Sequence, residues 1–424
     1  MPDHNGMHFA VYTHKYVLED GRLVLRMFIV LKDGDGDIVA FTNFHKFCRN
    51  SSRKIRALME TGGKRTSYVC QLLNYVYFQK YHIKCLQELT IDMVRDFLNA
   101  YGKSELPGDT KKRNAATVKI CIRSILDFII NWSTEDPRCL IKKNDLVKTK
   151  TYRNAKGKIV HTNVLPFDVI YDPDVKVTFR DIPEKVFYIV LEEILKNHPE
   201  IMMPFALGAF AGLRPSEAMC VRREDSELGP GIIFSEHNGK TTSVTIDLTK
   251  EMNLRSDLTL TGRIKKERRA RVYPAFLTNF MEIYNSYMTF IEGRNYEKTY
   301  GPLTLNRSGK AMTYASYSEK IRKVFSELQP AFLSDSDPEV VEYGKMLEIY
   351  NIGPHIFRHW FTIQLVLAGE GESAIMYWRG DKSPESARAY LSNKSALEKK
   401  YKIVSDEITE FNLWRTEKLY GKKH

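Results

Sequence analysis

No stretch of this 424-residue chain approaches the roughly 18 consecutive apolar residues that a helix needs to cross a bilayer. The first residues also lack the charged-then-apolar pattern of a secretion signal. Six cysteines are scattered, with no C-x-x-C pair and no histidine cluster beside them, so neither a zinc site nor a disulfide framework is expected. No P-loop and no carboxylate cluster suited to magnesium occurs. These absences predict a soluble protein of the cytoplasm that uses no cofactor.

Positive charge is in excess, with a formal net charge of +12. The hydrophobic fraction of 43% and the charged fraction of 27% are typical of a soluble globular protein, and the length is sufficient for more than one core. A basic chain favours a polyanionic partner. Because no membrane feature accompanies the charge, nucleic acid is the better candidate, although many soluble proteins are basic without a specific reason.

The pattern of apolar residues changes three times along the chain and so divides it into four parts. In chain order these are a strand-rich element at 1–50, a helical domain at 51–136, a basic linker without periodicity at 137–178, and a mixed domain at 179–424. The last part changes from helical to strand-like and back, as expected for helices around one small sheet. We therefore expect a multidomain protein that is mainly α with small β-sheets (α+β).

Local signals refine the helical part. Thr90 is a suitable N-cap for one helix, and a further helix is expected over 111–132. Its first turn would carry a run of positive charge: Lys111, Lys112 and Arg113. Such a run is as often a solvated face as a phosphate-binding surface, so its role depends on what the rest of the chain contains.

Three short segments of the mixed domain place charged or phenolic side chains at helix boundaries. In 212–217, Gly-Leu-Arg-Pro-Ser-Glu, Arg214 lies between a glycine that suits a helix end and a proline that suits a helix start. His355 and Arg358 stand three residues apart on one helix face, a pair suited to phosphate binding and proton transfer. Tyr390 lies near the end of a short helix that begins with Ser-Pro. Each segment alone is more often structural than functional.

Together, and in this order, Arg214, His355-x-x-Arg358 and Tyr390 resemble the catalytic set of the tyrosine recombinase (phage integrase) family. The surrounding letters agree: Gly-Leu-Arg-x-Ser-Glu in the first segment, His-x-x-Arg-His in the second, and Gly-x followed by eight residues and the tyrosine in the third. The likeness is strongest over roughly 180–395. The helices at 60–133 resemble the family's core-binding domain more loosely, which implies a helical DNA-binding domain ahead of a mixed catalytic one.

The resemblance implies a role for each residue. Tyr390 would attack a DNA phosphate and form a 3′-phosphotyrosyl bond, which stores the energy for rejoining without ATP or metal. Arg214 and Arg358 would bind the non-bridging oxygens, where charge develops in the transition state. His355 would accept or position the phenol proton.

The family protonates the departing 5′ oxygen with a lysine on a β-hairpin loop. Counting back from Arg-Val-x-Pro gives Lys265 or Lys266, depending on a one-residue gap, and Lys266 is preferred. A simpler interpretation, in which both lysines only contact the DNA backbone, stays open. The basic hairpin and the basic helix start supply the candidates for DNA binding: Lys111, Lys112, Arg113, Lys265, Arg268 and Arg269.

One catalytic position departs from the family pattern. Asp381 stands nine residues before the tyrosine, where the family usually has histidine or tryptophan. A carboxylate there repels a phosphate unless it is paired or protonated. Arg379 or Lys382 is available to neutralise it, or it hydrogen-bonds a neighbouring arginine. His359 directly follows Arg358, a place that more often serves packing.

The implied function is site-specific recombination for the integration and excision of a mobile element. The implied partner is double-stranded DNA, bound by four protomers in synapsis and by a monomer otherwise, with an accessory DNA-bending or excision factor and no membrane. The strand-rich element would bind arm-type DNA sites, and a helix at 395–418 would dock on a neighbouring subunit or pack on its own domain. Two alternatives stay open: a topoisomerase-like nicking and resealing enzyme, and a DNA-binding protein of this fold with impaired catalysis.

Overall fold

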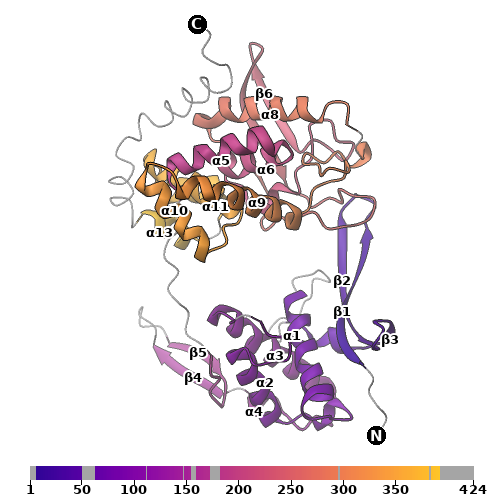
Figure 1. Ribbon diagram of the computed structural model, residues 1–424. Coiled ribbons are helices and arrows are strands. Elements are labelled where there is room, and N and C mark those ends of the chain that lie inside the picture. The colour runs from indigo at the N-terminus through magenta and orange to yellow at the C-terminus, as the bar shows by residue number, and fades with distance from the viewer. Residues whose placement is uncertain are drawn as a thin grey trace. The chain divides into compact units, whose positions relative to one another are not determined.

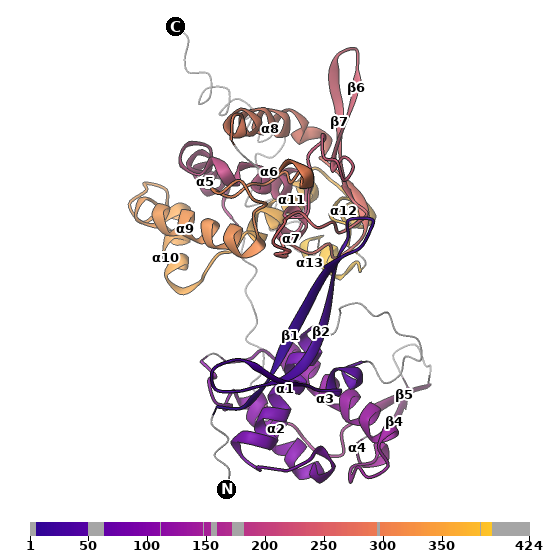
Figure 2. The same cartoon turned by 90° about the vertical axis from the view of Figure 1, so that its right-hand side faces the viewer.

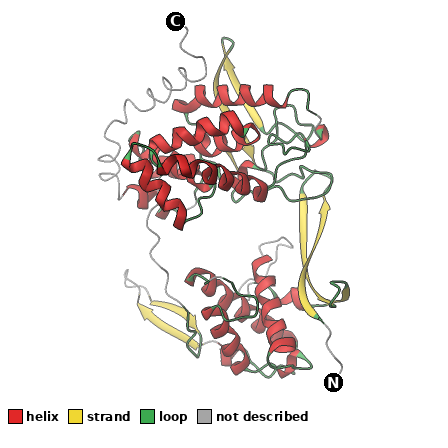
Figure 3. Ribbon diagram, viewed as in Figure 1, coloured by secondary structure: helices red, strands yellow, loops and turns green. Residues whose placement is uncertain are grey.

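The computed structural model describes residues 6–49, 63–110, 112–146, 148–153, 159–171, 182–294, 297–381 and 383–391. The chain divides into two compact units, the first made of residues 1–16 and 24–178 and the second of residues 17–23 and 179–424. Helices predominate in both, and the described strands form small sheets (Figures 1 and 3). The predicted fold class, mainly α with small β-sheets, is confirmed. None of the described helices is both long and apolar enough for a membrane span.

The first unit combines a sheet with a group of helices. The sheet has the order β1 (His8–Val17), β2 (Leu23–Lys32), β3 (Ile38–Phe41), and the main helices are α1 (Gly63–Asn74), α2 (Ile91–Lys103) and α3 (Ala115–Glu135). The Thr90 side chain caps α2 as predicted, since it accepts a hydrogen bond from the amide of Met93. Asn114 caps α3 in the same way through the amide of Thr117, so α3 begins after the basic run and not within it.

The strand-rich element does not form a separate domain. Phe9 and Ile29 belong to the same buried cluster as the helical residues Val69 and Phe128. The amide of Phe9 donates to the Asn74 side chain at 2.7 Å, and that side chain donates back to the Phe9 carbonyl at 2.9 Å. The sheet therefore completes the core of the helices, to which its inward apolar side chains contribute.

The predicted linker at 137–178 is partly ordered, so this expectation was wrong for much of its length. It contains α4 (Lys143–Leu146) and an antiparallel hairpin of β4 (Lys148–Arg153) and β5 (Ile159–Val164). Lysine alternates with threonine at the start of β4, and β5 contains isoleucine, two valines and a threonine. These β-branched residues favour an extended backbone despite the charge. Residues 172–178 of the segment lie outside the described residues.

The second unit wraps helices around one small sheet. Its antiparallel sheet has the order β6 (Ile232–His237), β7 (Lys240–Leu248), β8 (Arg268–Arg271), and the β6–β7 hairpin projects from the helices (Figure 2). The helices are α5 (Glu184–Asn197), α6 (Met202–Ala211), α7 (Pro215–Ala218), α8 (Leu277–Ile291), α9 (Tyr314–Leu333), α10 (Pro338–Ile349), α11 (His355–Leu367), α12 (Glu372–Arg379) and α13 (Glu385–Leu391).

Helix α6 forms the centre of this unit. All ten of its residues are buried, and it packs against α11 through rings such as Phe205 and Phe357, whose centroids lie 4.6 Å apart. Gly212 ends the helix with a φ of +62°, a conformation that residues with a side chain rarely adopt. The Phe361 ring also fills the place where a Cβ of residue 212 would lie. The backbone that leads to Arg214, two residues later, is therefore fixed by the end of α6.

The Gly212→Ala substitution is expected to destabilise the second unit by about 2–4 kcal/mol, because backbone strain and overpacking act together. Urea unfolding followed by tryptophan fluorescence would measure it. Gly353→Ala is the matched control, since no atom lies within 4 Å of its added Cβ, and a change within about 0.5 kcal/mol is expected. Equal midpoints for the two variants would show that the helix end is not constrained as described.

Candidate active site

The three predicted segments meet in the second unit. Arg214 is the residue before α7, His355 and Arg358 lie on the first turns of α11, and Tyr390 lies on α13. Asp381 follows α12, which ends at Gly380 with a φ of +64°. Arg214 and Asp381 are 167 residues apart in the chain and joined by a hydrogen bond. The packing of α6, α11 and α12 therefore brings the segments, which are far apart in the sequence, together in one cluster.

Asp381 lies at the centre of three guanidinium groups. Its Oδ1 accepts a hydrogen bond from Nη2 of Arg214 at 2.7 Å and another from Nη2 of Arg358 at 2.8 Å. Its Oδ2 accepts from Nε of Arg379 at 2.7 Å. The side chain keeps only 9% of its surface exposed, so the three cations supply the compensation that a buried carboxylate requires. The predicted pairing of Asp381 with neighbouring arginines is present; Lys382 lies outside the described residues.

Glu217 is a second carboxylate of the cluster and is fully buried. It accepts hydrogen bonds from Nη1 of Arg214 and from Nη2 of Arg268, each at 3.0 Å, and from the amide of Arg214 at 3.2 Å. Burial alone would raise the pKa of Glu217, but the hydrogen bond and charge of Arg268 and the charge of Arg214 hold it below its ordinary value. Glu217 is therefore ionised and fixes the orientation of Arg214.

Arg358 is held mostly by backbone carbonyls. Its Nη1 donates to the carbonyls of Gly212 and Arg379, the latter at 3.0 Å, while Nη2 donates to Asp381. Burial, together with the charges of Arg379 and Arg214, lowers the pKa of Arg358 to about 9. The guanidinium is still charged at neutral pH. Its plane is fixed by the end of α6 on one side and the end of α12 on the other.

The hydroxyl of Tyr390 is in contact with the imidazole of His359. Tyr390 is 4% exposed, and its hydroxyl is hydrogen-bonded to Nδ1 of His359. The guanidinium of Arg379 lies over the phenol ring, 5.4 Å from its centroid. Contacts thus run without a break from Tyr390 through Arg379 and Asp381 to the arginines of the first two segments. The sequence assigned His359 to packing, and its contact with the tyrosine was not predicted.

Charge and burial keep His359 neutral. Its pKa is lowered to about 4, first by burial and then by the positive charges of Arg379, His355 and Arg358. A neutral imidazole whose Nε2 carries the hydrogen presents Nδ1 as an acceptor to the phenol. His359 is thus able to receive the proton of Tyr390.

This pKa also predicts a dependence of stability on pH. Because the folded protein holds the pKa of His359 below its unfolded value, the unfolded state binds the proton more readily, and stability falls as pH decreases from about 6.5 towards 4. Between pH 7 and pH 5 the wild type is expected to lose about 2 kcal/mol more than His359→Asn. Urea unfolding of both proteins at both values would measure this difference. Parallel losses in the two proteins would contradict the lowered pKa.

His355 lies on the open side of the cluster. Although its side chain is exposed, the atoms packed beside the ring lower its pKa, and the charges of Arg358, Arg214 and Lys265 lower it further. Lys265 is therefore close to the cluster. The contact of Lys266 is made by its backbone: its carbonyl accepts a hydrogen bond from Nη1 of Arg268 at 3.3 Å.

The candidate DNA-binding residues divide into two groups. Arg268 and Arg113 point into the protein: the first donates to Glu217, and the second donates to Asp109 and covers the Tyr101 ring at 4.0 Å. These guanidinium groups have structural partners and are poorly placed for a DNA backbone. The exposed candidates are Lys112, Lys265 and Arg269, and Lys111 lies outside the described residues.

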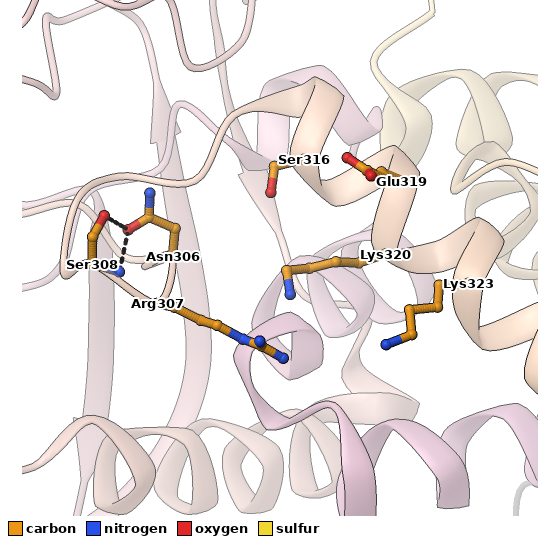
Figure 4. Close-up of a pocket in the computed structure, with 7 residues that line it drawn as sticks. All are labelled: Asn306, Arg307, Ser308, Ser316, Glu319, Lys320 and Lys323. Atoms are coloured by element: carbon orange, nitrogen blue, oxygen red, sulfur yellow. Dashed lines mark hydrogen bonds between the residues drawn. The ribbon is translucent and has the colours of Figure 1, made fainter.

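A separate basic pocket lies on the surface of the second unit. It has a volume of about 640 Å³ between α9 and the turn at 306–308. The charged ends of Arg307, Lys320 and Lys323 point toward one another across it (Figure 4). Lys320 is paired with Glu200 and Lys323 lies 3.5 Å from Glu327, so part of this charge is neutralised.

Within the described ranges, one group of side chains has the spacing of metal ligands: Glu193, His198 and Glu327. His198 Nε2 lies 3.0 Å from Glu327 and 3.6 Å from Glu193. The group uses none of the residues of the arginine cluster. Ion pairs account for its geometry, because Asn197 and Lys323 also contact the two carboxylates.

No protein-family model matches the chain, and no curated protein matches it. Among solved structures it is similar to the Tn1549 transposon integrase in complex with transposon right end DNA, at 12% identity over 82% of this chain and 94% of that chain, with a TM-score of 0.49. It is also similar to the XerH site-specific recombinase bound to difH substrate (14%, 78% and 76%, 0.44) and to a lambda integrase dimer bound to a core site (9%, 89% and 94%, 0.37). These three solved structures are those of DNA recombinases and integrases.

Proposed function

We propose that the protein is a site-specific recombinase of the tyrosine recombinase family, which cuts and rejoins DNA through a phosphotyrosyl bond at Tyr390. One observation carries the proposal: Arg214 and Arg358 direct their Nη2 atoms at a single anion, Asp381, whose third partner, Arg379, lies over the ring of Tyr390. A phosphodiester is an anion of the same charge as that carboxylate, and bidentate guanidinium groups are its usual ligands.

The first step is a transfer of the phosphoryl group to the phenol. The Tyr390 oxygen attacks phosphorus as its proton passes to Nδ1 of His359, which the neutral state of that imidazole permits. The bond from phosphorus to the 5′ oxygen breaks, and the 3′ phosphate is left on the tyrosine. Arg214 and Arg358 stabilise the charge that develops on the non-bridging oxygens. The reverse reaction, with a 5′ hydroxyl of another strand, reseals the backbone without ATP.

The departing 5′ oxygen needs a proton, and Lys265 is the donor we propose. The positive charge of Lys265 contributes to the lowered pKa of His355. This supports Lys265 over Lys266, the residue preferred from the sequence. His355, on the open side of the same cluster, is proposed to hold a non-bridging oxygen. Its neutral imidazole donates a hydrogen bond there without adding charge.

Lys265→Ala is expected to slow cleavage by about 10²–10⁴-fold, the range of general acid catalysis, and Lys266→Ala by less than about threefold. Single-turnover cleavage would measure both rates. On a duplex whose bridging 5′ oxygen is replaced by sulfur, a leaving group that needs no proton, Lys265→Ala should recover the wild-type rate. Rescue of Lys266→Ala instead would reverse the assignment.

The partner we propose is double-stranded DNA, in keeping with the net charge of +12. Lys112, Lys265 and Arg269 are exposed, and the basic pocket at Arg307 adds a further surface for phosphates. Synapsis by four protomers, a role in moving a mobile element, an accessory bending or excision factor, a site in the bacterial cytoplasm and docking by residues 395–418 belong to the same proposal. That tail lies outside the described residues.

The test is to trap the covalent intermediate. The full chain is incubated with a duplex from the repeats beside its gene, nicked next to the cleavage position so that the released 5′ end diffuses away. A protein–DNA adduct on a denaturing gel, mapped by proteolysis and mass spectrometry to Tyr390, is the expected result. Absence of an adduct, or an adduct at another residue, would overturn the proposal. Strand exchange between two labelled duplexes separates a recombinase from a topoisomerase-like enzyme, which relaxes a supercoil but exchanges no strands.

A further inference from the structure

The position between the guanidinium groups of Arg214 and Arg358 is filled by a side chain of the protein itself. We call this position the phosphate site. Asp381 reaches it with Oδ1, which is hydrogen-bonded to both Nη2 atoms at 2.7 and 2.8 Å. The same carboxylate marks the place where the sequence departs from the pattern that the chain resembles. An acidic residue has therefore replaced a neutral one at the point where an anionic substrate would be bound.

The hydrogen bonds of Arg214 and Arg358 show that Asp381 is the anion bound by the Nη2 atoms of both arginines. Nη1 of Arg358 donates to two backbone carbonyls, and Nη1 of Arg214 donates to Glu217. The Nη2 atoms face away from these partners and toward the cluster centre, where both meet Asp381. A phosphate oxygen that binds the two arginines there must take the place of Oδ1.

Electrostatics exclude simultaneous binding in this geometry. Two negative charges about 4 Å apart repel each other strongly where little water lies between them. The Asp381 side chain is only 9% exposed, so water screens little of this repulsion. Conversely, removing the carboxylate takes from Arg214, Arg358 and Arg379 the anion that all three bind, which favours the entry of another anion.

The carboxylate can leave the phosphate site without a change in the backbone. The amide of Asp381 is bound to the carbonyl of Met376 at 3.0 Å, and Oδ2 is bound to Nε of Arg379 at 2.7 Å. Rotation about the Cα–Cβ bond would withdraw both carboxylate oxygens, breaking the bond to Arg379, while the backbone hydrogen bond stays in place. Arg379 also lies over the ring of Tyr390, so the movement acts on the neighbour of the nucleophile.

Building on the proposed function, we propose that Asp381 is an internal competitor of the scissile phosphate. It occupies the phosphate site in the free protein, keeps the arginines oriented, and is displaced when a DNA phosphate is pressed into the cluster by binding elsewhere on the duplex. A free phosphate ion, which has no such additional contacts, binds the wild type weakly. Competition by Asp381 thus makes the reaction depend on contacts along the whole DNA site and not on the phosphate alone.

The test compares wild type with Asp381→Asn, which keeps the shape of the side chain and removes its charge. Binding of inorganic phosphate, followed by isothermal titration calorimetry on the full chain, is expected to tighten by at least about tenfold in the variant, a gain of about 1.4 kcal/mol. Phosphate should also raise the melting temperature of Asp381→Asn more than that of wild type. Asp335→Asn, which removes the carboxylate that Lys185 contacts at 2.6 Å, is the control and should behave as wild type.

Affinity for phosphate that is unchanged or weaker in Asp381→Asn would overturn the inference. Asp381→His provides a second neutral variant if the asparagine protein does not fold, and the same tightening is expected. Adduct formation on the nicked duplex separates this inference from the proposed function. Tighter phosphate binding without an adduct in any protein would reject the recombinase and keep the competitor, whereas an adduct in wild type with unchanged phosphate affinity would do the reverse.

Discussion

Tyr390→Phe is expected to abolish the covalent adduct, with a fall in cleavage rate of at least about 10⁴-fold. The substitution removes one oxygen, the atom that would bond to phosphorus, and leaves the ring that packs under Arg379. Binding to duplex DNA, measured by gel shift, should therefore stay within about twofold of wild type, since a change within about 0.5 kcal/mol is usual for a substitution that removes no buried contact surface. The readout is the fraction of labelled strand that remains attached to protein on a denaturing gel.

Tyr377→Phe is the matched control. Tyr377 lies on α12, close to the cluster in the chain, but it is 64% exposed. Loss of its hydroxyl should change neither binding nor cleavage. If Tyr390→Phe formed as much adduct as wild type, the nucleophile would be another residue and the assignment of the site would fail.

Arg358→Lys is expected to lower the cleavage rate by about 10²–10³-fold, the usual effect of removing one donor from a site that binds a developing charge. A lysine keeps the charge but offers a single point donor in place of a planar fork. The carbonyls of Gly212 and Arg379 would also lose a donor, so a loss of stability of about 1–3 kcal/mol should accompany the slower rate. Single-turnover cleavage and urea unfolding measure the two effects separately.

Arg255→Lys separates these two contributions. Arg255 is bonded much as Arg358 is, since it donates to the carbonyl of Ala311 at 2.8 Å and to the carboxylate of Asp257 at 2.6 Å. It should lose stability to a similar degree while its cleavage rate stays near that of wild type. Equal losses of rate in both variants would mean that Arg358 acts on folding alone.

Much of the site could be predicted from local sequence. Gly212 and the proline after Arg214 mark a helix end and a helix start, and both lie where expected. The spacing of His355 and Arg358 places them on one face of α11. These features depend on neighbours within a few residues, for which backbone preferences are strong.

The contacts that cross the chain could not be predicted. Asp381 is hydrogen-bonded to Arg214, which lies 167 positions earlier in the chain, and this contact depends on how α12 ends against α6 and α11. His359 illustrates the same limit. Neighbouring helical residues point about 100° apart, so nothing in the His-x-x-Arg-His letters indicates that the second histidine faces the tyrosine. Arg268 is the converse case, an apparently exposed basic residue whose partner, Glu217, lies far away in the chain.

The segment at 137–178, predicted as a linker, shows where composition misleads. A lysine-rich segment predicts an exposed irregular chain, but alternating β-branched residues were enough to form the β4–β5 hairpin. The start of α3 moved for a similarly local reason, because Asn114 is a better N-cap than the basic residues before it.

Glu217 gives the cluster a property that none of its cations has alone. One carboxylate orients the guanidinium of Arg214 and, through Arg268, the backbone of the loop that carries the proposed proton donor. In the proposed reaction, binding of the phosphate and protonation of the 5′ oxygen would therefore both depend on this buried carboxylate. Its loss would misalign both parts of the proposed site together.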